Sequence, residues 1–293
     1  MGCRTAAKWM LSLGWLLALP ASASEDAVFQ QVLERAKQLA ASPYQAPEAN
    51  LPEALQALNY DGYRQIRFNP ERAYWRDESP FSLQLFHSGF LFQTPVTLNL
   101  VEAGEVTPLD FTTDDFRYDG EANALLEHDL SGSGHAGFRL HYPINNSDYA
   151  DEFAVFLGAS YFRLVGQHQA YGLSTRGLAI NTASSQGEEF PAFREFWLVT
   201  PDNDTESVTL MALMDSPSLS GAYRFTLTPG EQTEAEVKAE IFARSDVEKV
   251  GIAPLTSMFT YGEASAQRPD DFRPQVHDSD GLLMHTGSGE WIW

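Results

Sequence analysis

The sequence predicts a mainly β chain: an antiparallel sandwich or barrel preceded by short helices. Apolar residues alternate with a period of two in many short segments after residue 60. Turn signals such as Gly89 and Pro229-Gly230 separate these segments, and little of this part has a helical period. Because no repeat and no internal linker interrupts it, we expect residues 61–293 to form one domain.

The N-terminus has the three parts of a secretory signal peptide. Arg4 and Lys8 precede an apolar stretch at 9–19, and an Ala-Ser-Ala cleavage site follows at 21–23. The apolar stretch is shorter than the about 20 residues that span a bilayer, so a membrane anchor is the weaker interpretation. Cleavage before Ser24 would also remove Cys3, the single cysteine, and with it any disulfide or thiolate chemistry. We therefore expect an exported, periplasmic protein.

Residues 24–60 are expected to form a helical lead-in to the β domain. Apolar residues recur at helical spacing over 25–42, and Ser42-Pro43 ends the pattern. A second, short helix is expected after Asn50 as N-cap, with Pro52 in its first turn.

Strands are expected wherever the alternation is regular. Gly89 should turn the chain between two of them, and the segments around Pro229-Gly230 should pair as a hairpin. The expected strands are residues 81–85, 90–92, 96–100, 138–144, 208–214, 223–227 and 237–241.

The formal net charge is -21. Such a surface repels polyanions, which argues against nucleic acid and anionic membrane as partners. A neutral polysaccharide would not be repelled. The charge can equally serve solubility alone, so both interpretations stay open.

Several kinds of chemistry lack their motif in this chain. The segment 172–177 (GLSTRG) has one residue too many for a nucleophile elbow. The segment 278–281 (DSDG) resembles a calcium loop, but its glycine comes too early and Leu282 stands where an acid is needed. There is no HExxH and no glycine-rich loop opening a helix. We therefore predict neither a metal nor a cofactor.

Acid–base chemistry on a polysaccharide remains. Two segments, 158–197 and 251–293, break the alternation with polar and aromatic residues, as rim loops and concave faces do. On a strand, Asp278 and Asp280 would share a face at about 6–7 Å, close to the about 6.5–9.5 Å of inverting glycosidases. The alternative is an Asx-turn in which both aspartates bind their own backbone.

Other residues in the two segments suit sugar contacts. Indole rings can stack on sugar rings or fill a core, and arginines can orient hydroxyls or form salt bridges, so both roles stay open. The candidate substrate-binding residues are Tyr161, Arg163, Arg176, Trp197, His277, Glu290, Trp291 and Trp293.

Eleven stretches carry a resemblance to a known family. They are 142–145 (YPIN), 157–163 (LGASYFR), 171–174 (YGLS), 176–180 (RGLAI), 187–191 (GEEFP), 193–197 (FREFW), 215–217 (DSP), 221–223 (GAY), 253–259 (APLTSMF), 277–279 (HDS) and 289–293 (GEWIW). Together they resemble the periplasmic glucans biosynthesis proteins G and D. The resemblance implies a role in making osmoregulated periplasmic glucans, which have a β-1,2-linked backbone, and a relation to the inner-membrane synthesis machinery. It also implies a galactose mutarotase-like sandwich followed by an immunoglobulin-like domain.

The resemblance further implies a possible reaction. Some members resemble inverting endo-acting hydrolases of β-1,2-glucan, in which the aspartate of the His-Asp-Ser element is the general base. That residue is Asp278 here, and Asp280 then returns to a loop role. The general acid of the family lies beyond Trp293, so we expect this chain to be a fragment without the acid, the rest of the sandwich and the immunoglobulin-like domain. A non-catalytic glucan-binding or scaffold protein is the alternative, and an aldose epimerase is suggested by fold analogy alone.

Overall fold

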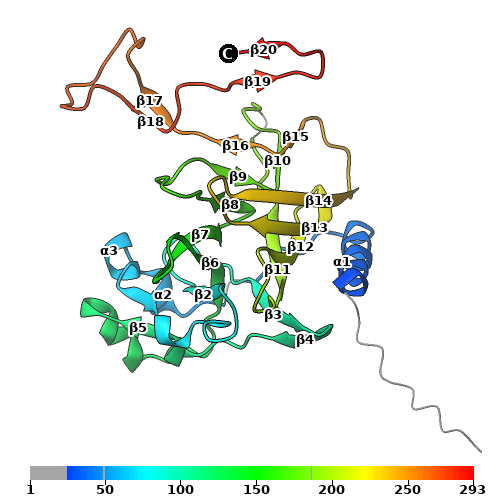
Figure 1. The fold of residues 1–293 in the computed structure, drawn as a ribbon, viewed down its shortest axis with the longest axis vertical. Coiled ribbons are helices and arrows are strands. Elements are labelled where there is room, and N and C mark those ends of the chain that lie inside the picture. The colour runs from blue at the N-terminus through cyan, green and yellow to red at the C-terminus, as the bar shows by residue number, and fades with distance from the viewer. Residues whose placement is uncertain (1–24, 49, 186) are drawn as a thin grey trace, which may run out of the picture.

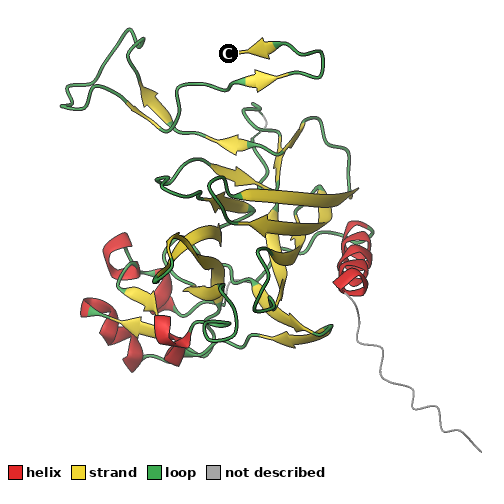
Figure 2. Cartoon of the chain, in the orientation of Figure 1, coloured by secondary structure: helices red, strands yellow, loops and turns green. Residues whose placement is uncertain are grey.

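The computed structural model describes residues 25–48, 50–185 and 187–293. The predicted signal peptide, residues 1–23, lies outside them. Two six-stranded sheets pack face to face, and short helices and hairpins surround them (Figure 1, Figure 2). The predicted mainly β sandwich is confirmed.

The first sheet, here called the α1 sheet, has the strand order β14-β13-β12-β11-β3-β4. Its neighbours are antiparallel except β11 and β3, which are parallel. The bounds are β3 Thr97–Glu102, β4 Glu105–Pro108, β11 Ala192–Val199, β12 Val208–Asp215, β13 Leu219–Thr228 and β14 Glu234–Ala243. The predicted hairpin around Pro229-Gly230 is the β13–β14 pair.

The second sheet, here called the β6 sheet, has the order β16-β9-β8-β7-β6-β2, and all of its pairs are antiparallel. The bounds are β2 Ser82–His87, β6 His135–Asn146, β7 Tyr149–Leu157, β8 Tyr161–Leu164, β9 Ser174–Arg176 and β16 Leu255–Thr256. The strand predicted at 90–92 is wrong: only an isolated bridge joins Gly89 and Phe92, because Phe90 has a positive φ of 53°.

Aromatic rings from both sheets form the centre of the core. The ring centre of Phe156 in the β6 sheet lies 5.3 Å from that of Phe225 and 5.8 Å from that of Phe196, both in the α1 sheet, and both pairs are edge-on. Phe138 stacks on Phe156 at 5.0 Å. Such pairs stabilise a core beyond the area they bury, and they follow from the alternation that directs every second side chain inward.

Helix α1, Glu25–Ala40, covers the outer face of the α1 sheet. Its apolar stripe packs on side chains of β11, β12 and β13, as the helical spacing predicted. The buried residues of this layer are Val28, Phe29, Val32, Leu33, Ala36, Val101, Trp197, Met211, Leu213 and Ala222.

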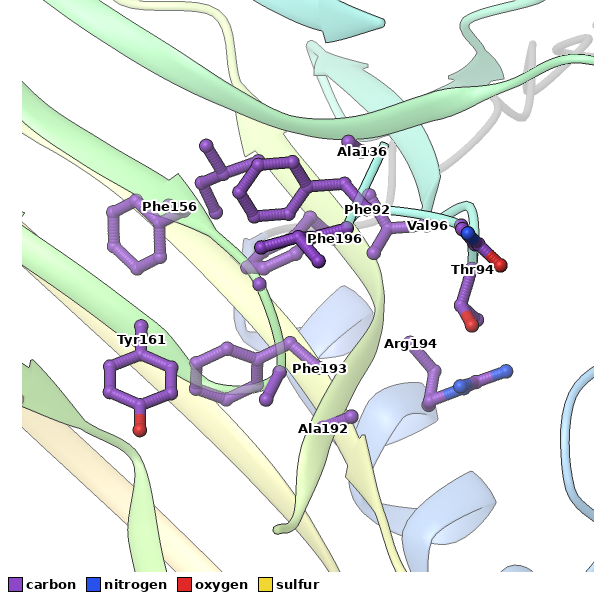
Figure 3. Close-up of a pocket in the computed structure, with 15 residues that line it drawn as sticks. Phe92, Thr94, Val96, Ala136, Phe156, Tyr161, Ala192, Phe193, Arg194 and Phe196 are labelled. Carbon is purple, nitrogen blue, oxygen red and sulfur yellow. The ribbon is translucent and has the colours of Figure 1, made fainter. Parts of the chain in front are cut away.

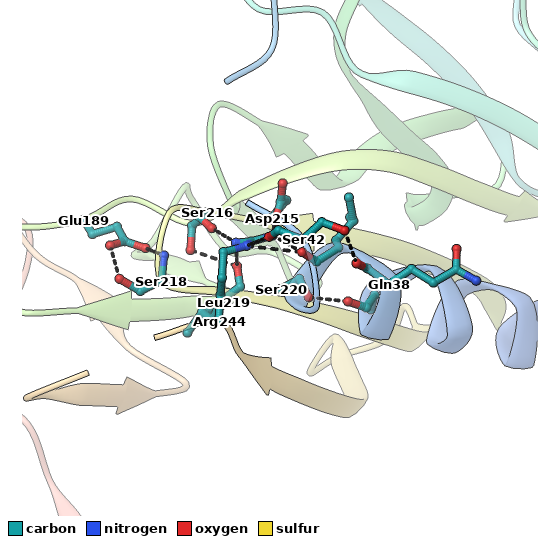
Figure 4. Close-up of polar contacts among 11 residues, drawn as sticks. Gln38, Ser42, Glu189, Asp215, Ser216, Ser218, Leu219, Ser220 and Arg244 are labelled. Carbon is teal, nitrogen blue, oxygen red and sulfur yellow. Dashed lines mark hydrogen bonds and ion pairs between the residues drawn. The ribbon is translucent and has the colours of Figure 1, made fainter. Parts of the chain in front are cut away.

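A polar cluster ties the end of α1 to the sheet (Figure 4). Arg244 donates from Nε to the Ser42 carbonyl at 2.8 Å, from Nη2 to the Leu39 carbonyl at 2.7 Å and to Asp215 Oδ1 at 2.8 Å, and from Nη1 to the Ser216 carbonyl. Helix C-termini leave carbonyls without partners, and this guanidinium satisfies them.

Short helices and a small sheet lie at the end of the sandwich beside β2 (Figure 1). These are α2 Glu53–Gln56, α3 Tyr60–Tyr63, the 3-10 helices η1 Pro70–Arg72, η2 Thr113–Asp115 and η3 Gly120–Glu127, and the pair β1 Ile66–Phe68 with β5 Phe116–Tyr118. The predicted Asn50 cap is wrong. Pro52 is the N-cap of α2, with no side-chain cap bond, and the Asn50 amide instead donates to Glu48.

Three two-stranded pairs complete the described chain. They are β10 Leu178–Ile180 with β15 Val250–Ile252, β17 Phe259–Tyr261 with β18 Val276–His277, and β19 Met284–His285 with β20 Trp291–Ile292. The last two pairs lie beyond β16, at the top of Figure 1. Among the described residues, no helix combines the length and the apolar character that crossing a bilayer requires.

Candidate functional site

The outer face of the β6 sheet carries polar and aromatic side chains around a cleft. Alternation along β2 and β6 buries Leu83, Leu85 and Phe138 and directs Gln84 and Arg139 to the opposite face. The resulting sheet-face cleft has a volume of about 430 Å3. Among the residues that line it are Phe86, Glu152, Tyr161, Arg163, Tyr171 and Ser174.

Glu152 is the centre of a hydrogen-bond network in this cleft. Arg139 donates from Nη1 to Glu152 Oε2 at 3.0 Å and from Nη2 to Gln84 Oε1 at 2.7 Å. The Tyr171 hydroxyl donates to Glu152 Oε1. The pKa of Tyr171 is raised to about 12, mainly by burial of the phenol and then by the neighbouring Glu152. The phenol therefore keeps its proton at neutral pH and donates it in the hydrogen bond. The carboxylate is therefore held in place at both oxygens.

Arg163 fixes the other side of the cleft. Its guanidinium lies 5.0 Å from the centre of the Tyr171 ring and donates to Ser174 Oγ at 3.2 Å from Nη2 and 3.3 Å from Nε. Tyr171 itself is exposed, and Tyr161 lines the same cleft from β8. Aromatic faces beside fixed donors and a fixed acceptor are the usual composition of a sugar site.

Arg176 is buried next to this group and forms a salt bridge, one of the two roles that the sequence left open. Its Nη1 donates to Glu188 Oε1 at 2.6 Å, and its guanidinium lies 5.5 Å from the Tyr161 ring and 5.4 Å from the Phe190 ring. It therefore supports Tyr161 from beneath, and its hydrogen-bonding capacity is partly used within the protein.

Trp197 lies in the core, which was the alternative to a sugar contact. Its side chain comes from β11, is only 6% exposed and packs under α1 with Arg35 5.3 Å from its ring. The covered outer face of the α1 sheet is on the opposite side of the sandwich from the cleft.

The predicted residues of the C-terminal segment do not line the sheet-face cleft. Asp278 is exposed in the loop after β18, where its Oδ2 accepts from the Met258 backbone N–H at 2.8 Å. The His277 ring stacks on Phe259 at 5.5 Å, and its Nε2 lies 3.5 Å from Asp280 Oδ1. These two aspartates thus have different local partners, in keeping with a loop role for Asp280.

The aromatic residues at the end of this segment are exposed. Trp291 stacks on His285 at 4.4 Å, which leaves it 65% exposed, and Trp293 is 79% exposed. The Glu290 backbone N–H donates to Thr286 Oγ1 at 3.1 Å, while its side chain is open to solvent. The structure therefore separates the candidates into a cleft group, Tyr161 and Arg163 with Arg176 beneath, and a group in the C-terminal hairpins.

Sequence reasoning did not single out Gln84, Phe86, Arg139 or Glu152. Gln84 and Arg139 occupy outward positions of the strands predicted at 81–85 and 138–144, and Phe86 comes directly after the first of these, so a search for polar or aromatic residues at such positions could have found them. Glu152 had no such signal, because β7 was not predicted and a register shift in the β6–β7 pair places it opposite His141. Among the described residues, no group of three or more His, Cys, Asp or Glu side chains could hold a metal ion.

Fold and site define a β-sandwich protein with a polar, aromatic cleft on the outer face of one sheet. A family model described as "Periplasmic glucan biosynthesis protein, MdoG" matches residues 28–293. The chain belongs to this family of periplasmic glucan biosynthesis proteins, as the resemblance predicted.

Curated relatives bear the name Glucans biosynthesis protein G. That of Ralstonia nicotianae is 50% identical over 284 residues, which is 97% of this chain and 56% of the relative. That of Rhodopseudomonas palustris is 48% identical over 273 residues, 93% of this chain and 53% of the relative. That of Vibrio cholerae is 49% identical over 265 residues, which is 89% of this chain and 48% of the relative. The chain thus spans about half the length of the relatives it matches.

Proposed function

We propose that this chain binds β-1,2-linked glucan in the sheet-face cleft and serves periplasmic glucan biosynthesis in that way. The network of Glu152 with Arg139, Tyr171 and Gln84 is the observation that carries the proposal. It provides a fixed acceptor next to fixed donors, and sugar hydroxyls need both. The exposed Tyr171 ring offers an apolar face for a glucose ring. A neutral glucan is also compatible with the net charge of -21.

The proposal places the protein in the periplasm. It rests on the predicted signal peptide at residues 1–23 and on the family description. A role beside the inner-membrane synthesis machinery belongs to the same proposal.

We further propose that the protein cleaves or remodels the glucan with Asp278 as general base, in the manner of an inverting endo-β-1,2-glucanase. The Met258 N–H holds Oδ2 of Asp278, which fixes the carboxylate, and the residue is exposed to water. Inversion also needs an acid about 6.5–9.5 Å away. The resemblance assigns that acid to the part of the relatives that this chain does not span.

Titration calorimetry with linear β-1,2-glucan tests binding. Glu152→Gln removes the charged acceptor but keeps the shape of the side chain. We expect the affinity for the glucan to fall about tenfold or more, because hydrogen bonds to charged groups contribute about 1.5–3 kcal/mol. Glu105→Gln, at an exposed position of β4, is the matched control and should bind like the wild type. Equal affinities for the two variants, or no binding by the wild type, would refute the proposal.

Reducing ends released from the same glucan by the full-length parent, which spans the whole length of the relatives, test catalysis. Asp278→Asn should abolish release without weakening binding, because it removes a base and keeps an amide oxygen for the Met258 N–H. Equal release by both proteins refutes the role of Asp278. Binding without release by the full-length wild type favours the second candidate, a non-catalytic glucan-binding protein. That candidate is supported by the position of Asp278, which lies in the loop after β18 and outside the sheet-face cleft.

A further inference from the structure

A second cleft joins the first at the turn between β7 and β8. It has a volume of about 310 Å3 and shares Phe92, Leu157 and Tyr161 with the sheet-face cleft. The two are therefore parts of one groove. Ala159, in the connecting turn, has a positive φ of 41°, and its carbonyl accepts from the Phe193 N–H at 3.0 Å. Strained non-glycine residues of this kind often mark functional sites.

The far end of the groove holds an arginine without a partner. Arg194 lines the second cleft, and no hydrogen bond or ion pair joins its guanidinium to any of the described residues. Burial lowers its pKa and is a larger influence than Tyr44 and Asp215, which act in the opposite direction. Asp215 is already engaged, because its Oδ1 accepts from Arg244. By contrast, Arg163 in the sheet-face cleft donates to Ser174.

The backbone explains why this arginine is directed into the cleft. The pairing of β11 with β12 shifts register between Phe193 and Glu195, so Arg194 is the extra residue of a β-bulge. Bulges re-aim side chains and are frequent next to functional sites. Figure 3 shows the polar ends of Arg194 and Thr94 on the same side of the cleft, away from the rings of Phe156 and Phe196.

A partly buried guanidinium without a partner loses hydration and gains no ion pair in return. A ligand anion would compensate for the lost hydration, because guanidinium binds carboxylate and phosphate oxygens through two parallel hydrogen bonds. Phe156, Phe193 and Phe196 of this cleft are buried in the core, but Phe92 and Tyr161 are partly exposed, and these two rings suit a sugar ring rather than a free small anion.

We propose that Arg194 and Thr94 form an anion subsite at the end of the groove, and that it takes a negatively charged group attached to the glucan chain. The inference rests on the proposed glucan binding and extends it. The sheet-face cleft holds neutral glucose units, and the second cleft selects a chain that carries an anion.

A matched pair of ligands tests this with the full chain. One is a linear β-1,2-glucooligosaccharide, and the other is the same oligosaccharide with its reducing end oxidised to a carboxylate. We expect the wild type to bind the oxidised form about tenfold more tightly. Arg194→Gln should bind both alike, with the wild-type affinity for the neutral form. Arg194→Lys should keep part of the preference, and Arg64→Gln, an exposed arginine on the Tyr60 ring, should keep all of it.

The outcomes separate the two proposals. Wild-type binding of the neutral ligand without preference for the oxidised one overturns the anion subsite and leaves the proposed function standing. A preference that persists in Arg194→Gln also overturns it. Failure of the wild type to bind either ligand overturns both. A preference that is lost in Arg194→Gln and weakened by added salt supports the subsite.

Discussion

Replacing Arg244 should destabilise the protein strongly, although it does not line the sheet-face cleft. This side chain joins α1 to the α1 sheet through bonds to the Leu39, Ser42 and Ser216 carbonyls and to Asp215 (Figure 4). Arg244→Met keeps much of the apolar stem and removes every one of these bonds.

The magnitude follows from burial. The side chains of Arg244 and Asp215 are 9% and 10% exposed. Removing one partner of a buried pair costs about 3–5 kcal/mol, because the other charge stays buried without compensation. For a protein of this size, each kcal/mol lowers the melting temperature by about 2–4 °C. We therefore expect a drop of about 10 °C.

Urea unfolding followed by tryptophan fluorescence measures this loss, since Trp197 lies under α1. The control is Arg67→Met, whose partner is Asp119. That pair is 67% and 46% exposed, so its removal should cost at most about 1 kcal/mol. Restoration of part of the stability by Asp215→Asn in the Arg244→Met background would show that the two residues act as a pair. Equal losses in the two single variants would refute the reasoning.

Two further predictions concern histidine burial and Trp197. Burial lowers the pKa of His87 and His135 to about 4, from 6.5 when unfolded, so the free energy of unfolding should fall as pH decreases from 6.5 to 4. His135→Gln should lessen that slope by up to about 1.4 kcal/mol per pH unit in urea titrations, and an unchanged slope would contradict this. Trp197→Ala should cost about 3–5 kcal/mol of stability and leave glucan affinity unchanged. Weakened glucan binding at wild-type stability would contradict the core position of Trp197.

The alternation of apolar residues was enough to predict the sandwich. It located β2, β3, β6, β12 and the β13–β14 hairpin, because each has one face in the core. It did not indicate β7 to β11. β8 to β10 and most of β11 lie within 158–197, whose polar and aromatic residues break the alternation and were interpreted as rim loops or a concave face.

The candidate site was predicted only in part for the same reason. Tyr161 and Arg163 were selected for their chemistry, and they do line the cleft. Glu152 is 19 residues and Arg139 is 32 residues from Tyr171 along the chain, and the pairing of β6 with β7 brings the two together beside it. His87 and His135 are 48 residues apart in the sequence, yet they are paired in register between β2 and β6. Long-range pairing of this kind leaves no local signal.

The most direct test of the account is a crystal structure of the chain with a linear β-1,2-glucooligosaccharide. We predict glucose units in the sheet-face cleft, with hydroxyls bonded to Glu152 and a ring on Tyr171. A ligand bound instead on Trp291 and Trp293, with the sheet-face cleft empty, would contradict the central claim.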